Sequence, residues 1–502
     1  PQAARLISIV WAAAAVPALA FYAALTGGSP SVLRACVMLV LLLAAPLVRR
    51  DGDPPTALAA ALFLILLANP FAAASVSLQL SFAAMSGLLW LTPRLMELLA
   101  GKRPRGRAFR LLAAGFSATM GALVFTTPLT AWYFGRLVLI SPLSNLLCLW
   151  AAGLVFMLGL ASVAAGFLWT PLGAVLAVGP RALVGYILWV ARRLAGIPYH
   201  AVYGANPYLK YWLAYAYLLF ALAWTLRPRS RRKYACAAVL AAAMLAVTVR
   251  LGQRRFGAGL DALILDVGQG QCVLLASEGR FALVDCGSGS GWVSAGDIAA
   301  DRLLAMGCRE LDYLILTHYD TDHVSGAAAL LERLEVDTLL APDAPEDAGP
   351  QSAVHDAAER AGLSAEPVRD FQKLSLGGAT LTVSPPVGKG GDNERGLAVL
   401  VSGGELELLI TGDMDGATER RLLEVWELPD IEVLVAGHHG SKYSTSEELL
   451  EAVRPETVCI SVGSNRYGHP SEAVLERLAR NGCTVWRTDL HGDIHLSLNW
   501  EK

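Results

Sequence analysis

Long apolar stretches dominate the first half of the chain. Apolar runs, most of about 16 to 25 residues, recur at 5–26, 32–48, 55–73, 76–92, 111–133, 137–166, 168–191, 208–226 and 234–249. A helix needs about 20 apolar residues to cross the hydrocarbon core of a bilayer. Because the last run is short, the pattern predicts a polytopic transmembrane domain of eight or nine helices over residues 1–252.

From about residue 259 the pattern changes to short strand-type runs that alternate with helical ones. Strand-type runs lie at 260–277, 280–287, 311–318, 406–413, 431–439, 457–463 and 492–498, and helical patterns lie at 296–307, 326–334, 416–426 and 471–482. Several strand runs end on polar residues, namely Asp266, His318, Asp413 and the pair His438 and His439. Such alternation is typical of a layered α/β domain with its site at the strand ends. We therefore expect a second domain over residues 253–502.

The charge distribution also divides the chain into two different bodies. Residues 1–250 hold 21 Lys and Arg and only three acids, whereas the remaining residues hold 20 basic and 40 acidic side chains. Basic clusters follow the second, fourth and eighth apolar runs, and the positive-inside rule places such clusters in the cytoplasm. If the ninth run also crosses the membrane, the second domain lies on the extracytoplasmic side.

Some of the apolar runs contain polar side chains that a simple anchor does not need. Arg34, Gln79 and Asn145 lie at membrane depth or at its edge. Polar groups in lipid are costly and often mark a pathway. They also serve as hydrogen-bonding contacts between helices, which is the more common role of any single one. Taken together, the runs favour a conduit over an anchor.

The densest group of ligand-type side chains is the stretch THYDTDHVSG at 317–326. Its pattern H-x-D-x-D-H consists of His318, Asp320, Asp322 and His323, and it follows a strand-type run directly. A polar turn is the alternative interpretation of this stretch alone. Asp413 and the histidine pair at two further strand ends favour a metal site, because two divalent ions about 4 Å apart generate hydroxide near neutral pH and stabilise an in-line displacement.

These motifs, in this order, resemble a known family. The stretches ILDVGQGQ, VDCG, THYDTDHVSG, TGD and HHGS resemble the metallo-β-lactamase fold, and more closely the C-terminal domain of the ComEC/Rec2 family of bacterial competence proteins. GGSPSVLRACVM, NPFAAASVSLQLSFAA and SPLSNLL resemble the membrane competence domain of the same family. The resemblance implies a multi-pass α-helical membrane domain followed by an αββα sandwich. It also implies that an OB-like domain precedes Pro1 in a longer protein.

The resemblance implies a role for each residue of the motifs. His318 and Asp320 would bind one metal ion, Asp322 and His323 a second, and Asp413 would bridge the two. One of His438 and His439 would complete the second site; which one is left open. The residues expected to act in catalysis or to contact a phosphate are Asp322, His438, His439, His469, Ser441 and Ser444, and those expected to orient the ligand loops are Asp266 and Asp285.

The chain departs from the general metallo-β-lactamase pattern at three positions. Asp320 replaces the second His of H-x-H-x-D-H, a change that the competence family shares. The third-motif His is missing, and Asn393 lies near its place. Gln271 stands where the family has Asp after DVGQG. Since an oxygen-richer site favours harder ions, the expected cofactors are two divalent ions, Zn or Mn, with Mg as a further candidate.

The resemblance implies a channel in the bacterial inner membrane that takes up single-stranded DNA in natural transformation, while its hydrolase domain degrades the other strand. DNA, the lipid bilayer and other proteins of the competence machinery are the partners that this implies. Two alternatives stay open. One is a membrane-tethered metallo-phosphodiesterase that acts on lipid or cell-wall phosphoesters, and the other is a conduit whose hydrolase-like domain is inert.

Overall fold

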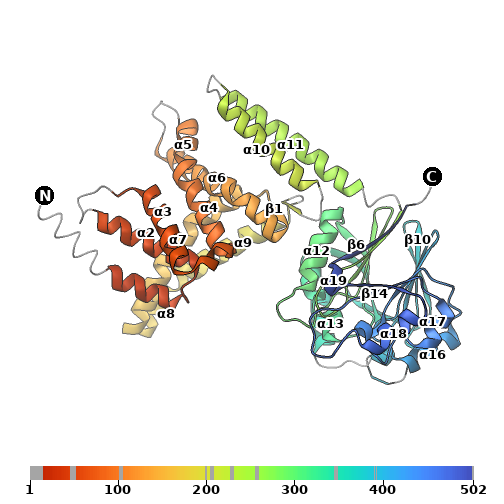
Figure 1. The fold of residues 1–502 in the computed structure, drawn as a ribbon. Coiled ribbons are helices and arrows are strands. Elements are labelled where there is room, and N and C mark those ends of the chain that lie inside the picture. Colours follow the sequence, from red (N-terminus) through yellow and green to blue (C-terminus); the bar gives the residue numbers. More distant parts are fainter. Residues whose placement is uncertain are drawn as a thin grey trace, which may run out of the picture. The chain divides into compact units, whose positions relative to one another are not determined.

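The computed structural model describes residues 15–45, 52–100, 106–197, 200–203, 208–226, 231–254, 259–343, 349–388, 390–391 and 393–499. These residues form two compact units, drawn as ribbons in Figure 1. The first unit comes from 1–204 and 213–239, and the second from 205–212 and 240–502. The expected boundary at residue 252 falls within a continuous helix, Arg231–Arg254, and stays a prediction.

The described part of the chain before residue 255 is helical with two very short strands. Its helices are α2 Pro30–Ala44, α3 Pro54–Ala68, η2 Pro70–Ala74, α4 Val76–Trp90, α5 Thr92–Ala100, α6 Arg107–Phe134, α7 Ser141–Leu168, α8 Thr170–Leu176, α9 Val178–Ala195, α10 Leu209–Thr225 and α11 Arg231–Arg254, and β1 Arg136–Val138 pairs with β2 Ala201–Tyr203. Proline is well suited to the first turn of α2 and α3, because backbone N–H groups there have no hydrogen-bond partner within the helix and the N–H that proline lacks is not needed. Gly135, with a φ of 60°, ends α6 in the left-handed conformation.

Among the described residues, four helices are long and apolar enough to cross a membrane: Arg107–Phe134, Ser141–Leu168, Thr170–Ala195 and Arg232–Gln253. A fifth arises if Val76–Trp90 and Thr92–Leu99, which meet at a bend of 40°, form one span. The apolar helices Ala15–Leu25, Pro30–Ala44 and Pro54–Ala68 are shorter. The prediction of several apolar helices is confirmed. The count of eight or nine stays a prediction, and the first expected run, 5–26, begins outside the described residues.

Helices α4 and α6 pack through two glycines. A Cβ atom on Gly87 would lie 1.9 Å from the carbonyl oxygen of Gly121, and a Cβ on Gly121 would lie 2.2 Å from Thr92 Oγ1. Small residues let helix backbones approach this closely, which is how helices associate where water gives no hydrophobic driving force.

The second unit is built on two seven-stranded sheets. The first sheet has the order β16-β3-β4-β5-β6-β7-β8 and the second has the order β15-β14-β13-β12-β11-β10-β9. Their bounds are β3 Gly259–Ile264, β4 Val273–Ser277, β5 Arg280–Val284, β6 Glu310–Ile315, β7 Glu335–Pro342, β8 Ala365–Val368, β9 Gln372–Leu376, β10 Ala379–Val383, β11 Val399–Gly403, β12 Leu406–Ile410, β13 Val433–Val435, β14 Thr457–Ile460, β15 Thr484–Arg487 and β16 Ile494–Asn499.

Helices cover the outer face of each sheet. Figure 1 shows them on the two outer faces of the second unit. They are α12 Ala295–Met306, α13 Thr321–Val324, α14 Ala327–Leu331, α15 Pro350–Arg360, α16 Gly416–Val425, α17 Glu447–Val453, α18 Glu472–Arg480 and α19 Thr488–His491, with the short turns η3 Asn393–Arg395 and η4 Gly437–Gly440.

Alternation along the strands fills three apolar layers. On β3, Leu263 packs in the layer beneath α12 and α14, whereas the adjacent Ile264 packs between the sheets. On β12, Leu408 lies between the sheets and Leu409 lies in the layer beneath α17 and α18. Successive strand residues point to opposite faces, so each strand supplies two layers at once. The expected αββα sandwich is confirmed.

The parallel part of each sheet determines where the site forms. Strands β5, β6, β7 and β8 run parallel in the first sheet, and β12, β13, β14 and β15 run parallel in the second. The carboxyl ends of parallel neighbours meet at one edge of a sheet, and polar residues gather there.

Candidate metal centre

The H-x-D-x-D-H stretch lies just beyond β6 and contains a single helical turn, α13. His318 and Asp320 precede this turn, whereas Asp322 and His323 are part of it. The turn brings the two histidines together, and their ring centroids are 4.0 Å apart. Both imidazoles are almost completely buried.

Asp285, one residue beyond β5, organises the two histidines. Its carboxylate accepts hydrogen bonds from Thr317 N at 2.7 Å, Thr317 Oγ1 at 2.8 Å, Gln271 Nε2 at 2.8 Å and His323 Nδ1 at 2.7 Å. Since Thr317 Oγ1 donates to Asp285, it accepts from His318 Nδ1, which lies 3.0 Å away. Both histidines are therefore protonated on Nδ1, which makes Nε2 the atom available to a metal ion, the arrangement that metal-binding imidazoles adopt.

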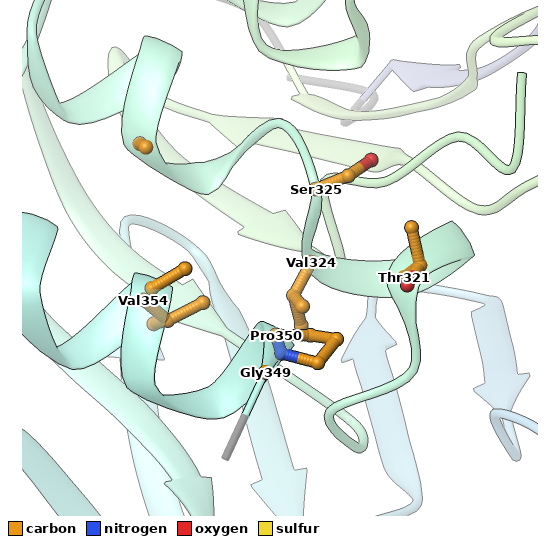
Figure 2. Close-up of a pocket in the computed structure, with 8 residues that line it drawn as sticks. Thr321, Val324, Ser325, Gly349, Pro350 and Val354 are labelled. Carbon is orange, nitrogen blue, oxygen red and sulfur yellow. The ribbon is translucent and has the colours of Figure 1, made fainter. Parts of the chain in front are cut away.

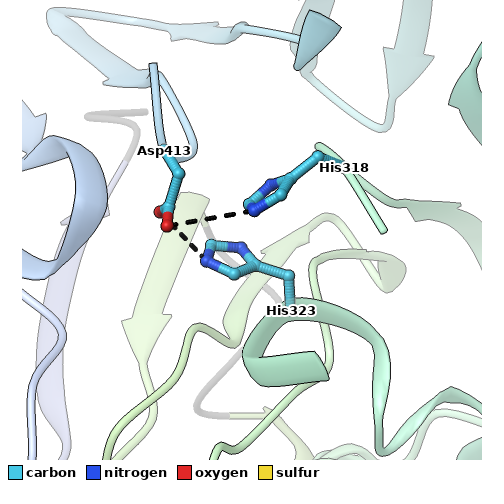
Figure 3. A group of neighbouring side chains, drawn as sticks. All are labelled: His318, His323 and Asp413. Atoms are coloured by element: carbon cyan, nitrogen blue, oxygen red, sulfur yellow. Dashed lines mark ion pairs between the residues drawn. The ribbon is translucent and has the colours of Figure 1, made fainter. Parts of the chain in front are cut away.

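The Nε2 atoms of both histidines face Asp413, which lies three residues beyond β12 (Figure 3). Asp413 Oδ1 lies 3.0 Å from His323 Nε2, and Asp413 Oδ2 lies 3.9 Å from His318 Nε2. Within the described part of the chain, these two Nε2 atoms and Oδ1 have no hydrogen-bond partner. Buried lone pairs that face one another repel unless a cation lies between them, so the group fits a metal ion.

A second group of potential ligands shares His323. Asp322, His323 and His439 each offer an atom within 4.8 Å of the others, as do His318, His323 and Asp413. His439 Nε2 lies 3.3 Å from Asp322 Oδ2, and its Nδ1 lies 2.8 Å from the carbonyl oxygen of Ser461. The carbonyl accepts the Nδ1 proton, so Nε2 of His439 again points its lone pair into the group.

The two adjacent histidines of HHGS have different environments. Both have left-handed backbones, with φ of 50° for His438 and 55° for His439, and such strain in non-glycine residues is typical of functional sites. The His439 side chain is 1% exposed and the His438 side chain is 35% exposed. His438 Nε2 lies 3.6 Å from Asp413 Oδ2. The geometry thus places His439 within a ligand group and His438 at its exposed edge.

Asp320 and His469 lie at the exposed side of the cluster. Asp320 Oδ2 is 3.6 Å from His318 Nε2, and its side chain is 45% exposed. The His469 ring centroid is 5.7 Å from that of His438. Burial, and after it the neighbouring imidazoles of His438 and His439, lower the pKa of His469, so its imidazole is neutral near neutral pH.

Ser441, Ser444 and Asp266 are the other residues expected near the chemistry, and their roles stay predictions. Ser441 Oγ accepts a hydrogen bond from Tyr443 N at 3.4 Å, and Ser444 Oγ is buried with no partner among the described residues. Asp266 Oδ1 accepts from Gly268 N at 3.1 Å and so shapes the glycine-rich turn after β3. No contact in the described part of the chain joins Asp266 to a proposed ligand.

Asn393 lies in η3, at the start of a segment that packs against the histidine loop. Leu397, four residues further on, donates its N–H to the carbonyl oxygen of Thr317 at 2.8 Å. A ligand role for Asn393 in place of the missing histidine stays a prediction. His355 is the one histidine between residues 324 and 412 of the sequence. It lies in α15, and its Nε2 is 3.3 Å from Tyr319 Oη.

The charges of the site favour a cation at its centre. Burial lowers the pKa of His323, but the carboxylates of Asp413 and Asp285 outweigh burial and hold this pKa well above its usual value. Burial raises the pKa of Asp413, but His323 and His439 outweigh it and hold this pKa well below its usual value. A positive charge between the two side chains is therefore strongly favoured. Imidazole nitrogens with carboxylate oxygens suit Zn and Mn better than Mg.

A separate hollow of about 310 Å³ lies on the other side of α13 (Figure 2). Thr321, Val324 and Ser325 face it, together with Pro350 and Val354. Positions three and four apart share one face of a helix, so Asp322 and His323 point the other way, towards Asp413 and His439. The hollow is mostly apolar and belongs to the helix packing rather than to the metal centre.

Three positioning residues were not identifiable from the pattern of ligands. Gln271 and Thr317 hold Asp285, and Ser461 holds His439 through its backbone carbonyl. Thr317 could have been suspected of a positioning role from the sequence, since it precedes His318 directly. Gln271 is marked in the sequence only as a departure from the DVGQG motif, and Ser461 has no signal, because their contacts depend on how the loops after β3 and β14 meet the site.

Comparisons with known proteins match both units. A family model described as "Competence protein" matches residues 3–229, and one described as "Metallo-beta-lactamase superfamily" matches residues 265–463. ComE operon protein 3 of Bacillus subtilis is 27% identical, covering 95% of this chain and 62% of that protein. Recombination protein 2 of Haemophilus influenzae is 29% identical over the same shares. The chain thus spans about three fifths of the length of these relatives.

Among solved structures, the metallo-beta-lactamase fold protein YhfI of Bacillus subtilis matches with 12% identity and a TM-score of 0.33, covering 47% of this chain and 99% of that protein. The two family models follow one another in the chain and agree with the membrane unit and the αββα unit. Similarity to the competence relatives extends across both units. The chain therefore combines a region matched by the competence protein model with one matched by the metallo-β-lactamase superfamily model, and it is similar to competence proteins across both.

Proposed function

We propose that the chain forms a channel for single-stranded DNA in the inner membrane of a bacterium, and that its second unit is a metal-dependent phosphodiesterase that degrades the strand left outside. The similarity to competence proteins and the apolar helices support the membrane role. The observation that carries the enzymatic role is the pair of buried ligand groups that share His323. A structural remnant of a hydrolase has no need to keep buried lone pairs aimed at one point.

The ligand groups divide the work among the residues. His318, His323 and Asp413 would hold one ion, Asp322 and His439 would hold another, and Asp320 would add an oxygen at the exposed side. Divalent ions, when bound, supply the Lewis acidity that activates water and stabilises charge on a phosphodiester in an in-line displacement. Asp285 fixes the ligand orientation without touching the substrate.

His438 and His469 occupy the exposed edge, where a substrate arrives. Their rings lie 5.7 Å apart, and each has a nitrogen available to a phosphate oxygen or to a leaving group. Because its pKa is lowered, His469 is a hydrogen-bond donor through one nitrogen and an acceptor through the other near neutral pH. We assign these two residues to contacts with the phosphodiester.

The proposed location follows from the same assignments. The second unit would lie on the extracytoplasmic side, where incoming duplex DNA is met, and the membrane unit would pass one strand inward. The bilayer, DNA and further proteins of the competence machinery are its proposed partners.

The test is hydrolysis and uptake by the same Asp413 variant. We expect the purified full chain with Mn²⁺ or Zn²⁺ to cut labelled DNA, and Asp413→Ala to lower the rate by at least about 100-fold, since the group with His318 and His323 loses its carboxylate ligand. Asp430→Ala, an exposed carboxylate paired with Arg454, is the matched control and should be unaffected.

Transformation assays in a strain that lacks the chromosomal copy then test the channel. Cutting of phosphoesters with uptake that does not depend on the membrane unit would instead support the alternative, a tethered phosphodiesterase for lipid or cell-wall phosphoesters. If the unaltered chain cuts no DNA with Mn²⁺, Zn²⁺ or Mg²⁺, the enzymatic proposal is contradicted.

A further inference from the structure

The loop after the two histidines carries two exposed side chains on a buried frame. Lys442 and Tyr443 are exposed, Tyr443 by 69%, whereas Ser441, Ser444 and Thr445 on either side of them are buried. Surface loops usually expose most of their side chains to water. Here only two of the five side chains are exposed to solvent. One is a cation, which attracts phosphate, and the other is an aromatic ring, on which a base can stack.

The frame is held by side chains from α16 and α18. The buried carboxylate of Glu419 accepts hydrogen bonds from Thr445 N at 2.6 Å and Ser446 N at 2.8 Å. Arg477 donates to the carbonyl oxygens of Ser444 at 2.9 Å and of Thr445 at 2.6 Å. Thr445 has a φ of 54°, a strained conformation that these contacts stabilise. The side chains of Lys442 and Tyr443 contribute nothing to this frame, so they are free to serve another purpose.

The two side chains open onto a groove of about 630 Å³ between α16, α17 and α18. We call it the Lys442 groove and define it by Arg420, Lys442, Tyr443, Arg477 and Arg480. Its lining contains these four basic residues against three acids, Asp415, Glu447 and Glu448. Since the residues after 250 hold twice as many acids as bases, a local excess of positive charge is unusual here.

The basic side chains of the groove make at most weak ion pairs within the protein. Arg420 pairs with Glu448 at 3.2 Å and Arg480 with Glu447 at 3.2 Å, and the arginines are 53% and 69% exposed. Exposed pairs of this kind contribute little, typically below about 1 kcal/mol, so they yield readily to a phosphate. The ammonium of Lys442 lies 4.8 Å from the centroid of the Tyr443 ring and makes no ion pair within the described residues.

The groove begins next to the metal centre. Lys442 follows His439 by three residues, and Tyr443 O accepts a hydrogen bond at 2.8 Å from the N–H of Gly416, three residues beyond Asp413. Three residues span at most about 11 Å, so each end of the loop is within one or two nucleotides of the ligands. A strand bound at the metal centre is therefore long enough to reach the groove.

We propose that the Lys442 groove binds the segment of a single nucleic-acid strand that adjoins the scissile phosphodiester, with a base on Tyr443 and phosphates on Lys442, Arg420 and Arg480. Stacking of bases on exposed aromatic rings together with cations along the backbone is how proteins bind single strands without regard to sequence. The proposal rests on the proposed function and deepens it, because it makes the substrate a polymer and prefers a single strand over a duplex.

The first test measures binding in the Asp413→Ala chain without added metal, so that the strand stays intact during the titration. A fluorescein-labelled 20-mer of thymidine is titrated at several salt concentrations and followed by anisotropy. Lys442→Ala should weaken binding and reduce the slope of log K against log salt by about 0.7, one phosphate contact for a single strand. Tyr443→Ala should weaken binding by at least about 5-fold with the slope unchanged, because it removes stacking and no charge.

Two further variants sharpen the result. Arg369→Ala removes an exposed arginine paired with Asp343 outside the groove and should change neither affinity nor slope. Glu448→Gln frees Arg420 and removes a negative charge from the groove, so it should tighten binding. Unchanged affinity in Lys442→Ala, Tyr443→Ala and Glu448→Gln overturns the proposal, and so does equal loss of duplex binding in Tyr443→Ala, since stacked bases have no free face for the ring.

A substrate too small to reach the groove tests catalysis at the metal centre separately from strand binding in the Lys442 groove. Lys442→Ala and Tyr443→Ala in the otherwise unaltered chain should hydrolyse bis(p-nitrophenyl) phosphate at the unaltered rate while kcat/KM for the 20-mer falls about 10-fold or more. Equal losses on both substrates show a damaged site and contradict a separate strand subsite. A chain that hydrolyses neither substrate contradicts the enzymatic role, and the binding titrations then still decide on the groove.

Discussion

At the scale of single residues, the direction of each lone pair matters more than the identity of the ligands. The H-x-D-x-D-H pattern and Asp413 are readable from the sequence because each follows a strand. The hydrogen bonds that turn His318 and His323 are not readable, since they run through Thr317 and Asp285 from a different loop. Asp285 was expected to orient ligands, and its four hydrogen bonds are consistent with that role.

Replacing Asp285 should weaken metal binding without touching a ligand. Asp285→Asn keeps the shape of the side chain but removes the charge that holds the His323 proton on Nδ1. Loss of such an outer partner typically costs 10- to 100-fold in metal affinity, and we expect a loss in that range for Mn²⁺ or Zn²⁺ in competition with a chromophoric chelator.

A buried aspartate that pairs with an exposed histidine, away from the ligand groups, provides the control. Asp261 Oδ1 lies 2.8 Å from His495 Nε2 in the pairing of β3 with β16. Asp261→Asn should alter stability alone and leave metal affinity as it is. If both variants lose metal affinity equally, Asp285 acts through general stability and not through the orientation of His323.

At the scale of elements, the apolar runs predict helices well but not how they are joined. The run 137–166 contains β1 before α7 begins at Ser141, and the run 168–191 divides into α8 and α9. Such breaks depend on contacts between neighbouring segments, for example of β1 with β2, which the periodicity of one run does not contain. The strand runs of the second half are more informative, because alternation fixes which face of each strand is buried.

The glycine contact between α4 and α6 gives a test of how closely the membrane helices pack. Gly87→Ala places a methyl group 1.9 Å from the carbonyl oxygen of Gly121, so backbone atoms must move. Overpacking of this kind costs about 1–3 kcal/mol, and we expect the thermal unfolding of the chain in detergent micelles to begin at a lower temperature.

Gly153, in the middle of α7, provides the comparison because nothing lies within 4 Å of a Cβ built on it. Gly153→Ala should leave stability unchanged or raise it slightly, since alanine favours the helix by about 1 kcal/mol. Equal behaviour of the two variants would show that α4 and α6 separate in the micelle.

At the scale of the whole molecule, the candidate centre is assembled from both sheets. His318 and His323 follow β6 of the first sheet, whereas Asp413 and His439 follow β12 and β13 of the second. The meeting of these ends was predictable, because parallel strands direct their carboxyl ends to one edge. The choice between His438 and His439 was not predictable, because it depends on two left-handed backbone conformations in succession. Nor was the Lys442 groove, which three helices form together.

Removal of metal should therefore loosen the second unit. An ion present at 100 times its Kd stabilises the folded state by about 2.7 kcal/mol, and an ion held by His318, His323 and Asp413 would do so by joining the two sheets. For a unit of this size that corresponds to a fall of about 5–10 °C in Tm when EDTA is added, measured by calorimetry on the full chain. Asp413→Ala should show a much smaller fall. A Tm that EDTA leaves unchanged in the unaltered chain contradicts a metal that links the sheets.

His323 belongs to both ligand groups, yet its Nε2 offers one lone pair. The group that gains His323 binds its ion with the fuller set of ligands, and the other group is left with one ligand fewer. We expect loading in two separate steps, with a tightly held first ion and a second ion that exchanges freely. Under the proposed function, hydrolysis that requires both ions would follow the supply of the weaker-bound ion, so the metal content of the cell's surroundings would set the rate of cutting.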